Sequence, residues 1–339
     1  MQHRRRIRRR AALTFPLAAA ALPGPAGAED WRPPGHQQVR IIVPAAAGGT
    51  TDIMARLIAQ RLQARWGTPV VAENRAGGGG TIGTLEMVRA RPDGTTLMSG
   101  NIGPQSIAYS LFRNLPYKPE DITCIAGTIA GPNVLVASPS IQARTVPELV
   151  ALMKANPGKI SYGSTGVGQS PHLSGVWFTQ LSGTQAIHVP YRGSAPAQTG
   201  LLAGDVALLF DNLTGVIGLI RDGRVRALAV TSRERSPQLP EVPALRETMP
   251  EFASYEVDTW FGLFGPAGLP AEAVRTLNAE VNAWLDLPET KQRFLELGGV
   301  PLRKTPEEFL AFVRAEIEKW GTVIRRERSE EHTSELQSL

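Results

Sequence analysis

The stretch Val39-Arg-Ile-Ile-Val43-Pro44-Ala-Ala-Ala-Gly48-Gly49-Thr50-Thr51-Asp52 decides how this chain folds. Its first five residues form a β-branched run typical of a buried parallel strand, and Pro44 cannot extend a strand ladder. The small residues up to Gly49 permit a tight turn and close approach by another molecule. Apolar residues then recur at i and i+4, which predicts a helix that begins near Thr50 to Asp52. The free N–H groups of that helix point back at the strand end, and such a position suits an anion.

The same order of strand, loop and helix recurs along the chain. The chain has 339 residues, which exceeds the usual size of one hydrophobic core and favours two lobes. Alternating strands and helices with short connections indicate α/β architecture, in which ligands bind at the carboxyl ends of the strands. Two apolar runs separated by Gly131-Pro132 indicate a crossing between the lobes. Capping boxes at Thr145 and Thr305 predict two helix starts. The predicted strands are 39–43, 70–73, 95–99, 122–129, 134–137, 160–162, 186–189, 206–210, 225–230 and 260–264, and the predicted helices include 52–65, 81–91, 170–181 and 196–202.

The first 28 residues have the composition of an export signal. Six arginines precede an apolar stretch from Ala11 to Leu22, and Ala26-Gly27-Ala28 has the small-x-small form of a cleavage site. The apolar stretch is shorter than the ~20 residues that span a bilayer, so a retained membrane anchor is disfavoured. We therefore expect a periplasmic protein cleaved after Ala28, by either the general or the twin-arginine route.

The last residues, 328–339, differ from the rest of the chain. They have no apolar periodicity and read like a translated sequencing adapter, so we expect a non-native tail in place of the native C-terminus. The net charge of the whole chain is +5, but the six leader arginines leave −1 for the rest, and removal of the tail brings it to +1. The high isoelectric point therefore does not indicate a nucleic-acid partner.

A glycine-rich loop follows the second predicted strand. The run Gly78-Gly79-Gly80-Thr81-Ile82-Gly83 satisfies the G-x-G-x-x-G pattern of dinucleotide sites. Such a site also needs an acidic residue at the end of the next strand, but that strand ends in Ser99-Gly100-Asn101. The pattern therefore favours a cleft lined by backbone, with Gly80 and Asn101 as candidate ligand contacts.

A second glycine-rich loop lies between Ser161 and His172. Its hydroxyl and N–H groups gather at another predicted helix N-terminus, so a carboxylate can be held between this loop and the one at Gly48-Gly49. An alternative is a hydrolase with Ser164 or Ser170 as nucleophile and His172 as base. The G-x-S-x-G elbow is absent, however, and a histidine in the first turn of a helix is more typical of a structural hydrogen bond.

Four further residues have polar or reactive side chains. Arg192 is suited to pair with a distal carboxylate or to be solvated, and Asp211 is a polar group at a strand end. Asp52 either caps its own helix or contacts a ligand amine, and the first interpretation is favoured. Cys124 stands alone and is expected to be a buried strand residue. The five histidines have no paired spacing, so we predict no metal and no other cofactor.

Five stretches in order resemble the Bug, or TctC-like, periplasmic substrate-binding proteins of tripartite tricarboxylate transporters. The resemblance covers residues 36–327 and rests on the following stretches: Val43-Pro44-Ala-Ala-Ala-Gly48-Gly49-Thr-Thr-Asp52-Ile-Met-Ala-Arg56, Glu73-Asn74-Arg75-Ala-Gly-Gly-Gly-Gly-Thr-Ile-Gly83, Gly163-Ser164-Thr-Gly-Val-Gly168-Gln-Ser-Pro-His172-Leu, His188-Val-Pro-Tyr-Arg-Gly193 and Trp260-Phe-Gly-Leu-Phe-Gly-Pro-Ala-Gly-Leu-Pro270.

The resemblance implies a two-lobed Venus-flytrap fold of the type II periplasmic-binding-protein class, each lobe a mixed sheet flanked by helices. Lobe 1 is predicted at 29–130 plus 253–327 and lobe 2 at 131–252. The implied function is capture of a small carboxylate, an organic acid or an acidic amino acid, in the interlobe cleft without catalysis. The implied partners are TctA- and TctB-like permease subunits. We expect the chain to be a monomer, and an alternative to transport is a ligand sensor that docks on a membrane receptor.

The resemblance also places candidate ligand-binding residues in two jaws. Together with the residues argued above, the predicted set is Ala46, Gly48, Gly49, Thr50, Asp52, Gly80 and Asn101 on one side, and Ser164, Thr165, Gly166, Gly168, Ser170, His172, Arg192 and Asp211 on the other.

Overall fold

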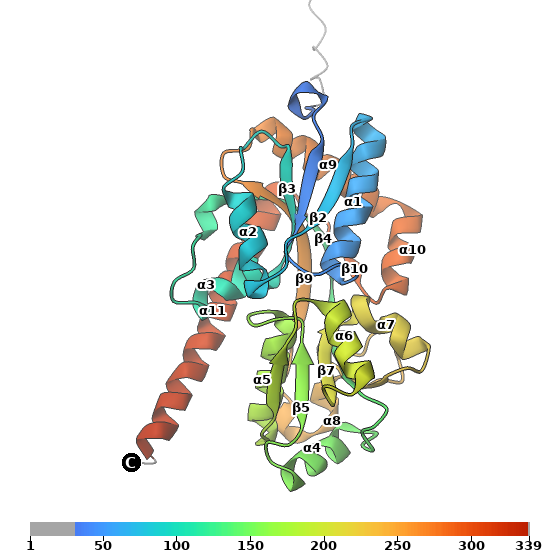
Figure 1. Cartoon of the computed structure of the whole chain (residues 1–339), viewed down its shortest axis with the longest axis vertical. Helices are drawn as coiled ribbons and strands as arrows, with labels where there is room; N and C mark the ends of the chain where they lie inside the picture. Colours follow the sequence, from blue (N-terminus) through green and yellow to red (C-terminus); the bar gives the residue numbers. More distant parts are fainter. Residues whose placement is uncertain (1–30, 338–339) are drawn as a thin grey trace, which may run out of the picture. The chain divides into compact units, whose positions relative to one another are not determined.

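The computed structural model describes residues 31–337, and side chains are described up to residue 325 with the exception of residue 36 (Figure 1). The predicted signal peptide, residues 1–28, lies outside the described residues, so its cleavage site stays a prediction. Within the described part, no helix combines the length and the apolar character that crossing a membrane requires.

The first lobe is built on the strands that pair around β1. In its sheet, β1 lies between β2 and β3 and is parallel to both, whereas β9 is antiparallel to β3. The strands are β1 (Val39–Val43), β2 (Val70–Asn74), β3 (Thr96–Asn101), β9 (Asp258–Pro266) and the short β10 (Val300–Pro301). Its helices are α1 (Thr50–Trp66), α2 (Thr81–Val88), α3 (Ala108–Leu111), α9 (Ala271–Asp286), α10 (Pro288–Glu296) and α11 (Pro306–Gln337), with the short turns η1 (Pro34–His36), η2 (Gly78–Gly80), η3 (Gly103–Ile107) and η4 (Pro119–Asp121).

The second lobe repeats this arrangement with a smaller sheet. Parallel strands β5, β6 and β7 alternate with α5 and α6, and β8 pairs with β4. The strands are β5 (Ser161–Ser164), β6 (Ile187–Pro190), β7 (Leu208–Asn212) and β8 (Arg226–Val230). The helices are α4 (Val146–Ala155), α5 (Ser170–Ser182), α6 (Ser194–Ala203), α7 (Leu213–Arg221), α8 (Leu245–Thr248) and η5 (Pro250–Phe252).

One long strand, β4 (Ile122–Ala137), belongs to both lobes. It pairs with β9 as far as Pro132 and with β7 from Asn133 onward, so the change of partner falls between these two residues. A proline tolerates this position because it lacks the N–H that a continuing ladder needs. The prediction of two strands separated by a break is therefore wrong. The predicted residue boundaries of the lobes stay a prediction.

The predicted apolar face of α1 is confirmed. Met54, Ile58 and Leu62 are buried against β1 residues such as Ile41 and Val43 in one hydrophobic cluster. Burial of each such side chain contributes about 1.5–3 kcal/mol before conformational entropy is counted. This packing fixes the start of α1 at the carboxyl end of β1, as the opening stretch predicts.

Other local predictions have mixed outcomes. Cys124 is buried in β4, as expected. Thr145 Oγ1 accepts the Glu148 N–H at 3.3 Å, and Thr305 Oγ1 accepts the Glu308 N–H at 3.2 Å, so both predicted helix caps are confirmed. The helix α7 was not expected. The backbone of α11 continues through most of the predicted tail, and the non-native origin of that tail stays a prediction.

Candidate functional site

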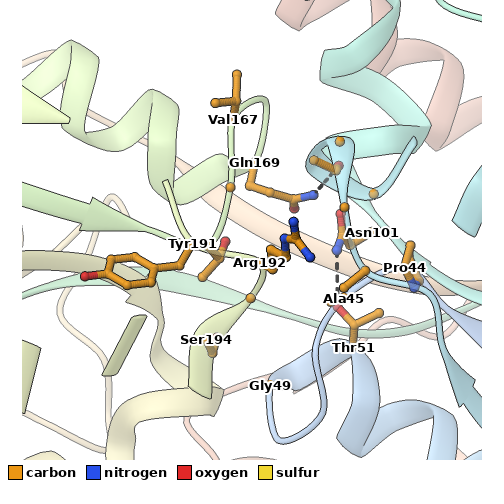
Figure 2. Close-up of a pocket in the computed structure, with 18 of the residues that line it drawn as sticks. Pro44, Ala45, Gly49, Thr51, Asn101, Val167, Gln169, Tyr191, Arg192 and Ser194 are labelled. Atoms are coloured by element: carbon orange, nitrogen blue, oxygen red, sulfur yellow. Dashed lines mark hydrogen bonds between the residues drawn. The ribbon is translucent and has the colours of Figure 1, made fainter. Parts of the chain in front are cut away.

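A cavity of about 530 Å³ lies where the carboxyl ends of the parallel strands of both lobes meet (Figure 2). Its first-lobe wall follows β1, β2 and β3, and its second-lobe wall follows β5, β6 and β7. This is the position at which open α/β sheets bind ligands. The lining residues are Pro44, Ala45, Gly49, Thr50, Thr51, Ala76, Gly77, Gly78, Gly79, Gly80, Ile82, Asn101, Phe112, Thr165, Gly166, Val167, Gln169, Pro190, Tyr191, Arg192, Gly193, Ser194 and Asn212.

Five helices begin at this cavity, and none of them has a side-chain cap. The helices are α1, α2, α5, α6 and α7. The helices α4 and α11 begin at a threonine whose hydroxyl accepts a first-turn N–H, whereas α8, α9 and α10 also lack a side-chain cap. The first N–H groups of a helix have no partner within it, and the helix dipole adds partial positive charge there. The starts of these helices therefore favour an anion in the cavity.

Arg192 is the one charged residue among those that line the cavity. Within the described part of the chain, its guanidinium makes no hydrogen bond or ion pair. Figure 2 shows it projecting between Gln169 of the second lobe and Asn101 of the first. No aspartate or glutamate lines the cavity. The site therefore favours a negatively charged ligand.

Asp52 holds the first-lobe loop rather than lining the cavity. Its side chain is buried and accepts the Gly48 N–H at 3.0 Å, two hydrogen bonds from Arg56 at 2.9 Å and one from Asn74 at 3.0 Å. Burial opposes ionisation of this carboxyl, but these donors outweigh it and lower the pKa of Asp52. The prediction that Asp52 caps its own helix is wrong, because the carboxylate accepts the Gly48 N–H of the preceding loop and no N–H at the start of α1.

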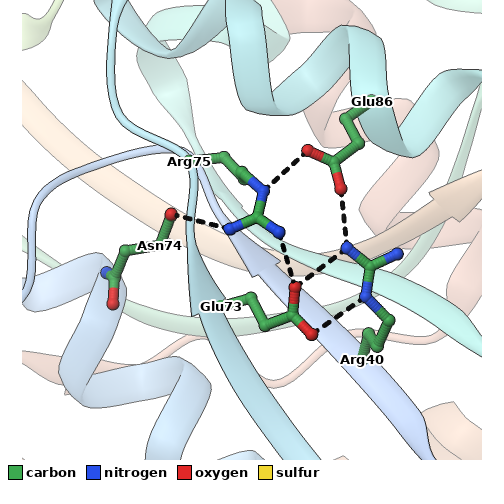
Figure 3. A network of polar contacts seen from close by, with 5 residues as sticks. All are labelled: Arg40, Glu73, Asn74, Arg75 and Glu86. Atoms are coloured by element: carbon green, nitrogen blue, oxygen red, sulfur yellow. Dashed lines mark hydrogen bonds and ion pairs between the residues drawn. The ribbon is translucent and has the colours of Figure 1, made fainter.

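An ionic network fixes the end of β2, where the glycine loop begins (Figure 3). Arg40 donates to Glu73 at 3.0 and 2.9 Å and to Glu86 at 2.6 Å. Arg75 joins the same two carboxylates at 2.8 and 2.9 Å. The hydrogen bond from Arg40 is the largest influence that lowers the pKa of Glu73. The network ties β1, β2 and α2 together directly before the loop.

The loop itself needs glycine. Residues 77–80 are four glycines whose φ angles lie between +57° and +132°, a region that side-chain-bearing residues rarely adopt. Asn101 borders the loop from β3, where its Nδ2 donates to Thr51 Oγ1 at 3.2 Å and its Oδ1 accepts the Gly103 N–H at 2.9 Å. The loop thus presents backbone to the cavity, as expected for a cleft lined by glycine.

Two stacked histidines hold the second-lobe loop from behind. Ser164 Oγ lies 2.7 Å from His188 Nε2, and the Gly168 N–H donates to His172 Nδ1 at 3.3 Å. The two rings stack with centroids 4.4 Å apart. Burial lowers the pKa of both histidines to about 4, so both are neutral near pH 7. The structural role expected for His172 is confirmed.

These histidines should make the protein less stable in acid. Their pKa falls from 6.5 unfolded to about 4 folded, so the unfolded state binds more protons between these values and stability rises with pH there. His172→Gln keeps an acceptor for Gly168 but does not titrate. We expect the rise in the free energy of unfolding across this window to shrink by on the order of 1–2 kcal/mol, measured by urea denaturation at several pH values.

Asp211 should affect the pH dependence of stability in the direction opposite to that of the two histidines. It is fully buried behind the cavity, where it accepts hydrogen bonds from Ser194 Oγ at 2.6 Å, Gln198 Nε2 at 2.8 Å and the Asn212 N–H at 2.8 Å. Burial raises the pKa of Asp211 from 3.8 to about 6, so this residue lowers stability as pH rises through that interval. Asp211→Asn should steepen the rise in stability. A His172→Gln variant with the slope of the wild type would contradict the assignment.

The fifteen predicted ligand-binding residues divide into two groups. Seven line the cavity: Gly49, Thr50, Gly80, Asn101, Thr165, Gly166 and Arg192. Eight lie outside the lining: Ala46, Gly48, Asp52, Ser164, Gly168, Ser170, His172 and Asp211. Each of the eight makes a hydrogen bond that fixes a loop or strand at the cavity edge. The predicted set does not include the lining residues Gln169, Ser194 and Asn212. Gln169 directly precedes the predicted helix 170–181 and Ser194 lies two residues before the predicted helix 196–202, whereas Asn212 begins α7, which was not expected.

The two lobes touch directly around the cavity. The Ala46 N–H donates to the Arg192 carbonyl at 2.9 Å, and Gln169 Nε2 donates to the Gly79 carbonyl at 2.7 Å. The Thr50 hydroxyl is hydrogen-bonded to the hydroxyl of Thr214 in α7. These contacts describe a closed arrangement in which loops from both lobes meet over one cavity.

Known proteins share this architecture. The family profile described as "Tripartite tricarboxylate transporter family receptor" matches residues 54–328. BugT of Bordetella pertussis is 35% identical over 312 residues, which cover 91% of this chain and 94% of BugT. An R. palustris protein solved with adipate has a TM-score of 0.82 at 34% identity, with 85% of this chain and 96% of that chain covered. MatC of Rhodopseudomonas palustris, solved with bound malate, has a TM-score of 0.80 at 31% identity, with 85% and 99% covered. The fold is thus the expected two-lobed α/β binding-protein fold, and the chain belongs to the tripartite tricarboxylate transporter receptor family, a family of substrate-binding receptors.

Proposed function

We propose that this protein binds a small carboxylate, an organic acid or an acidic amino acid, in the periplasm and delivers it to a tripartite tricarboxylate-type permease. The observation that carries the proposal is one cavity with five uncapped helix N-termini, one unpaired arginine and no acidic side chain. Two solved relatives support it, since one holds adipate and the other malate. A role as a ligand sensor that docks on a membrane receptor stays a prediction.

In this proposal, the two lobes close on the ligand like jaws. Lobe 1 comprises 29–130 plus 253–327, and lobe 2 comprises 131–252. The seven predicted residues that line the cavity contact the ligand, and the eight behind them hold the loops in place. Closure is favoured by the ligand because only the closed state brings donors from both lobes to the same anion. The ligand thereby replaces water at groups that would otherwise be solvated.

The protein is a receptor and not an enzyme, in line with its family. The hydrolase alternative is wrong, because the family consists of substrate-binding receptors. The local geometry agrees with this correction. Ser164 is buried and contacts His188 instead of His172, and Ser170 donates to Asn133 Oδ1 at 3.4 Å. Neither hydroxyl lines the cavity.

A thermal-shift panel tests the proposal. Mono-, di- and tricarboxylates, aromatic acids and amino acids are added to residues 29–327, and adipate and malate are included. A ligand at a hundredfold its dissociation constant should add about 2.7 kcal/mol to the free energy of unfolding. No stabilisation by any carboxylate at millimolar concentration would overturn the proposed function.

Arg192→Gln should weaken the binding of dicarboxylates more than the binding of monocarboxylates. Removal of a charge-assisted hydrogen bond to the distal carboxylate should raise the dissociation constant about tenfold, as measured by isothermal titration calorimetry. The matched control is Arg144→Gln, which removes the same charge from an exposed position that does not line the cavity. Equal losses for both ligand classes would contradict a role for Arg192 in recognising the second carboxylate.

A further inference from the structure

Gln169 reaches from the second lobe into the first. It is the N-cap residue of α5, but its side chain does not cap that helix. Instead, Nε2 donates to the Gly79 carbonyl at 2.7 Å, and the residue is only 8% exposed although it lies at the edge of its lobe. Figure 2 shows this hydrogen bond beside Arg192, at the boundary of the cavity. The side chain therefore contacts both the opposite lobe and the proposed ligand space.

The space that receives the amide exists because residue 103 is glycine. A Cβ at Gly103 would lie 2.6 Å from Nε2, 2.7 Å from Cδ and 2.7 Å from Oε1 of Gln169. Gly103 does not have a positive φ, so its backbone does not require glycine. Its three nearest potential contacts all belong to the other lobe. The approach of the Gln169 amide therefore accounts for a glycine at this position.

The backbone of Gln169 is held firmly behind this contact. Its N–H donates to the Gly166 carbonyl at 3.2 Å, and its own carbonyl accepts the Leu173 N–H at 3.2 Å. The neighbouring Gly168 N–H is bound by His172. Because the base of the side chain is fixed, the amide can enter its slot only when the lobes are together.

We propose that Gln169 is a positioning residue that latches the closed state, with its amide held in the slot between Gly79 and Gly103 of the opposite lobe. This inference rests on the proposed function, because closure of the lobes serves to capture the acid. The Gln169 side chain shifts the equilibrium between the open and closed states and does not recognise a particular group of the ligand. A loss of closed population lowers the apparent affinity for every ligand by the same factor.

The test is a double-mutant cycle with adipate and malate as probes. Gln169→Ala and Gly103→Ala should each raise the dissociation constants about tenfold, and by the same factor for both acids. The double variant should bind no more weakly than Gln169→Ala, because the added methyl then meets no amide. In the absence of ligand, small-angle scattering should give both single variants a larger radius of gyration than the wild type. Circular dichroism should show unchanged folding of Gly103→Ala.

Different outcomes of this experiment reject the latch and the proposed function. If the wild type binds adipate or malate and Gly103→Ala binds equally well, the latch is wrong and the function stands. Losses that differ strongly between the two acids would also overturn the latch, because they would make Gln169 a direct ligand contact. If the wild type binds no carboxylate, the proposed function fails, and the scattering comparison alone decides the latch. Identical scattering curves would then reject it.

Discussion

Gly79→Ala is expected to raise the dissociation constant for the carboxylate at least a hundredfold. A Cβ at this position would lie 2.0 Å from the backbone carbonyl oxygen of Val167, which belongs to the opposite lobe. Backbone atoms cannot move aside as the end of a flexible side chain can. The lobes must therefore stay apart, and the hydrogen bond from Gln169 to the Gly79 carbonyl is stretched or lost. A hundredfold loss corresponds to about 2.7 kcal/mol, as measured by calorimetric titration.

The same substitution strains its own loop, so a matched control is needed. Gly79 has φ +62°, and an alanine there costs about 1 kcal/mol of folding stability. Gly67, at the end of α1, has φ +66°, and its Cβ would meet no atom within 4 Å. Gly67→Ala should therefore lose similar stability but keep wild-type affinity. If Gly79→Ala binds within threefold of the wild type, the closed arrangement described here is not the ligand-binding one.

The sequence predicted the elements whose signals are local. The strand β1, the start of α1 and both threonine caps follow from neighbouring residues, and each is confirmed. The helix α7 was missed because Gly215 and Gly218 weaken its helical pattern. It forms because Val216 and Ile217 are buried against the second-lobe core. Tertiary packing thus overrides the local signal.

The candidate site was predicted to the level of loops but not of side chains. The five helix starts point to one cavity, yet only part of each loop faces it. Asp52 and His172 lie in the first turns of α1 and α5, and both hydrogen-bond the loop N–H four residues earlier. These hydrogen bonds depend on the conformation of the loop, which the sequence pattern does not predict. Gln169 was missed for another reason, since its partner Gly79 is 90 residues away in sequence.

Asn133→Ala is expected to cost about 3–4 kcal/mol of folding stability. Asn133 is fully buried in β4, where its Nδ2 donates to Ser174 Oγ at 3.1 Å and its Oδ1 accepts from Asn212 Nδ2 at 2.6 Å and from Ser170 Oγ at 3.4 Å. Alanine leaves three buried polar groups without this partner and opens a small cavity. Chemical denaturation with two-state analysis measures the loss.

The same variant should also weaken ligand binding, because the network reaches the cavity. Asn212 lines the cavity and precedes α7, and Ser170 begins α5, so both helix starts lose an anchor when Asn133 is removed. We expect a dissociation constant about tenfold higher at a temperature where the variant is folded. Asn114→Ala is the control, since Asn114 is exposed and its side chain makes no hydrogen bond within the described residues; it should change stability by less than about 0.5 kcal/mol. A stability loss for Asn133→Ala no larger than that of the control would show that the network does not hold the second-lobe loops in place.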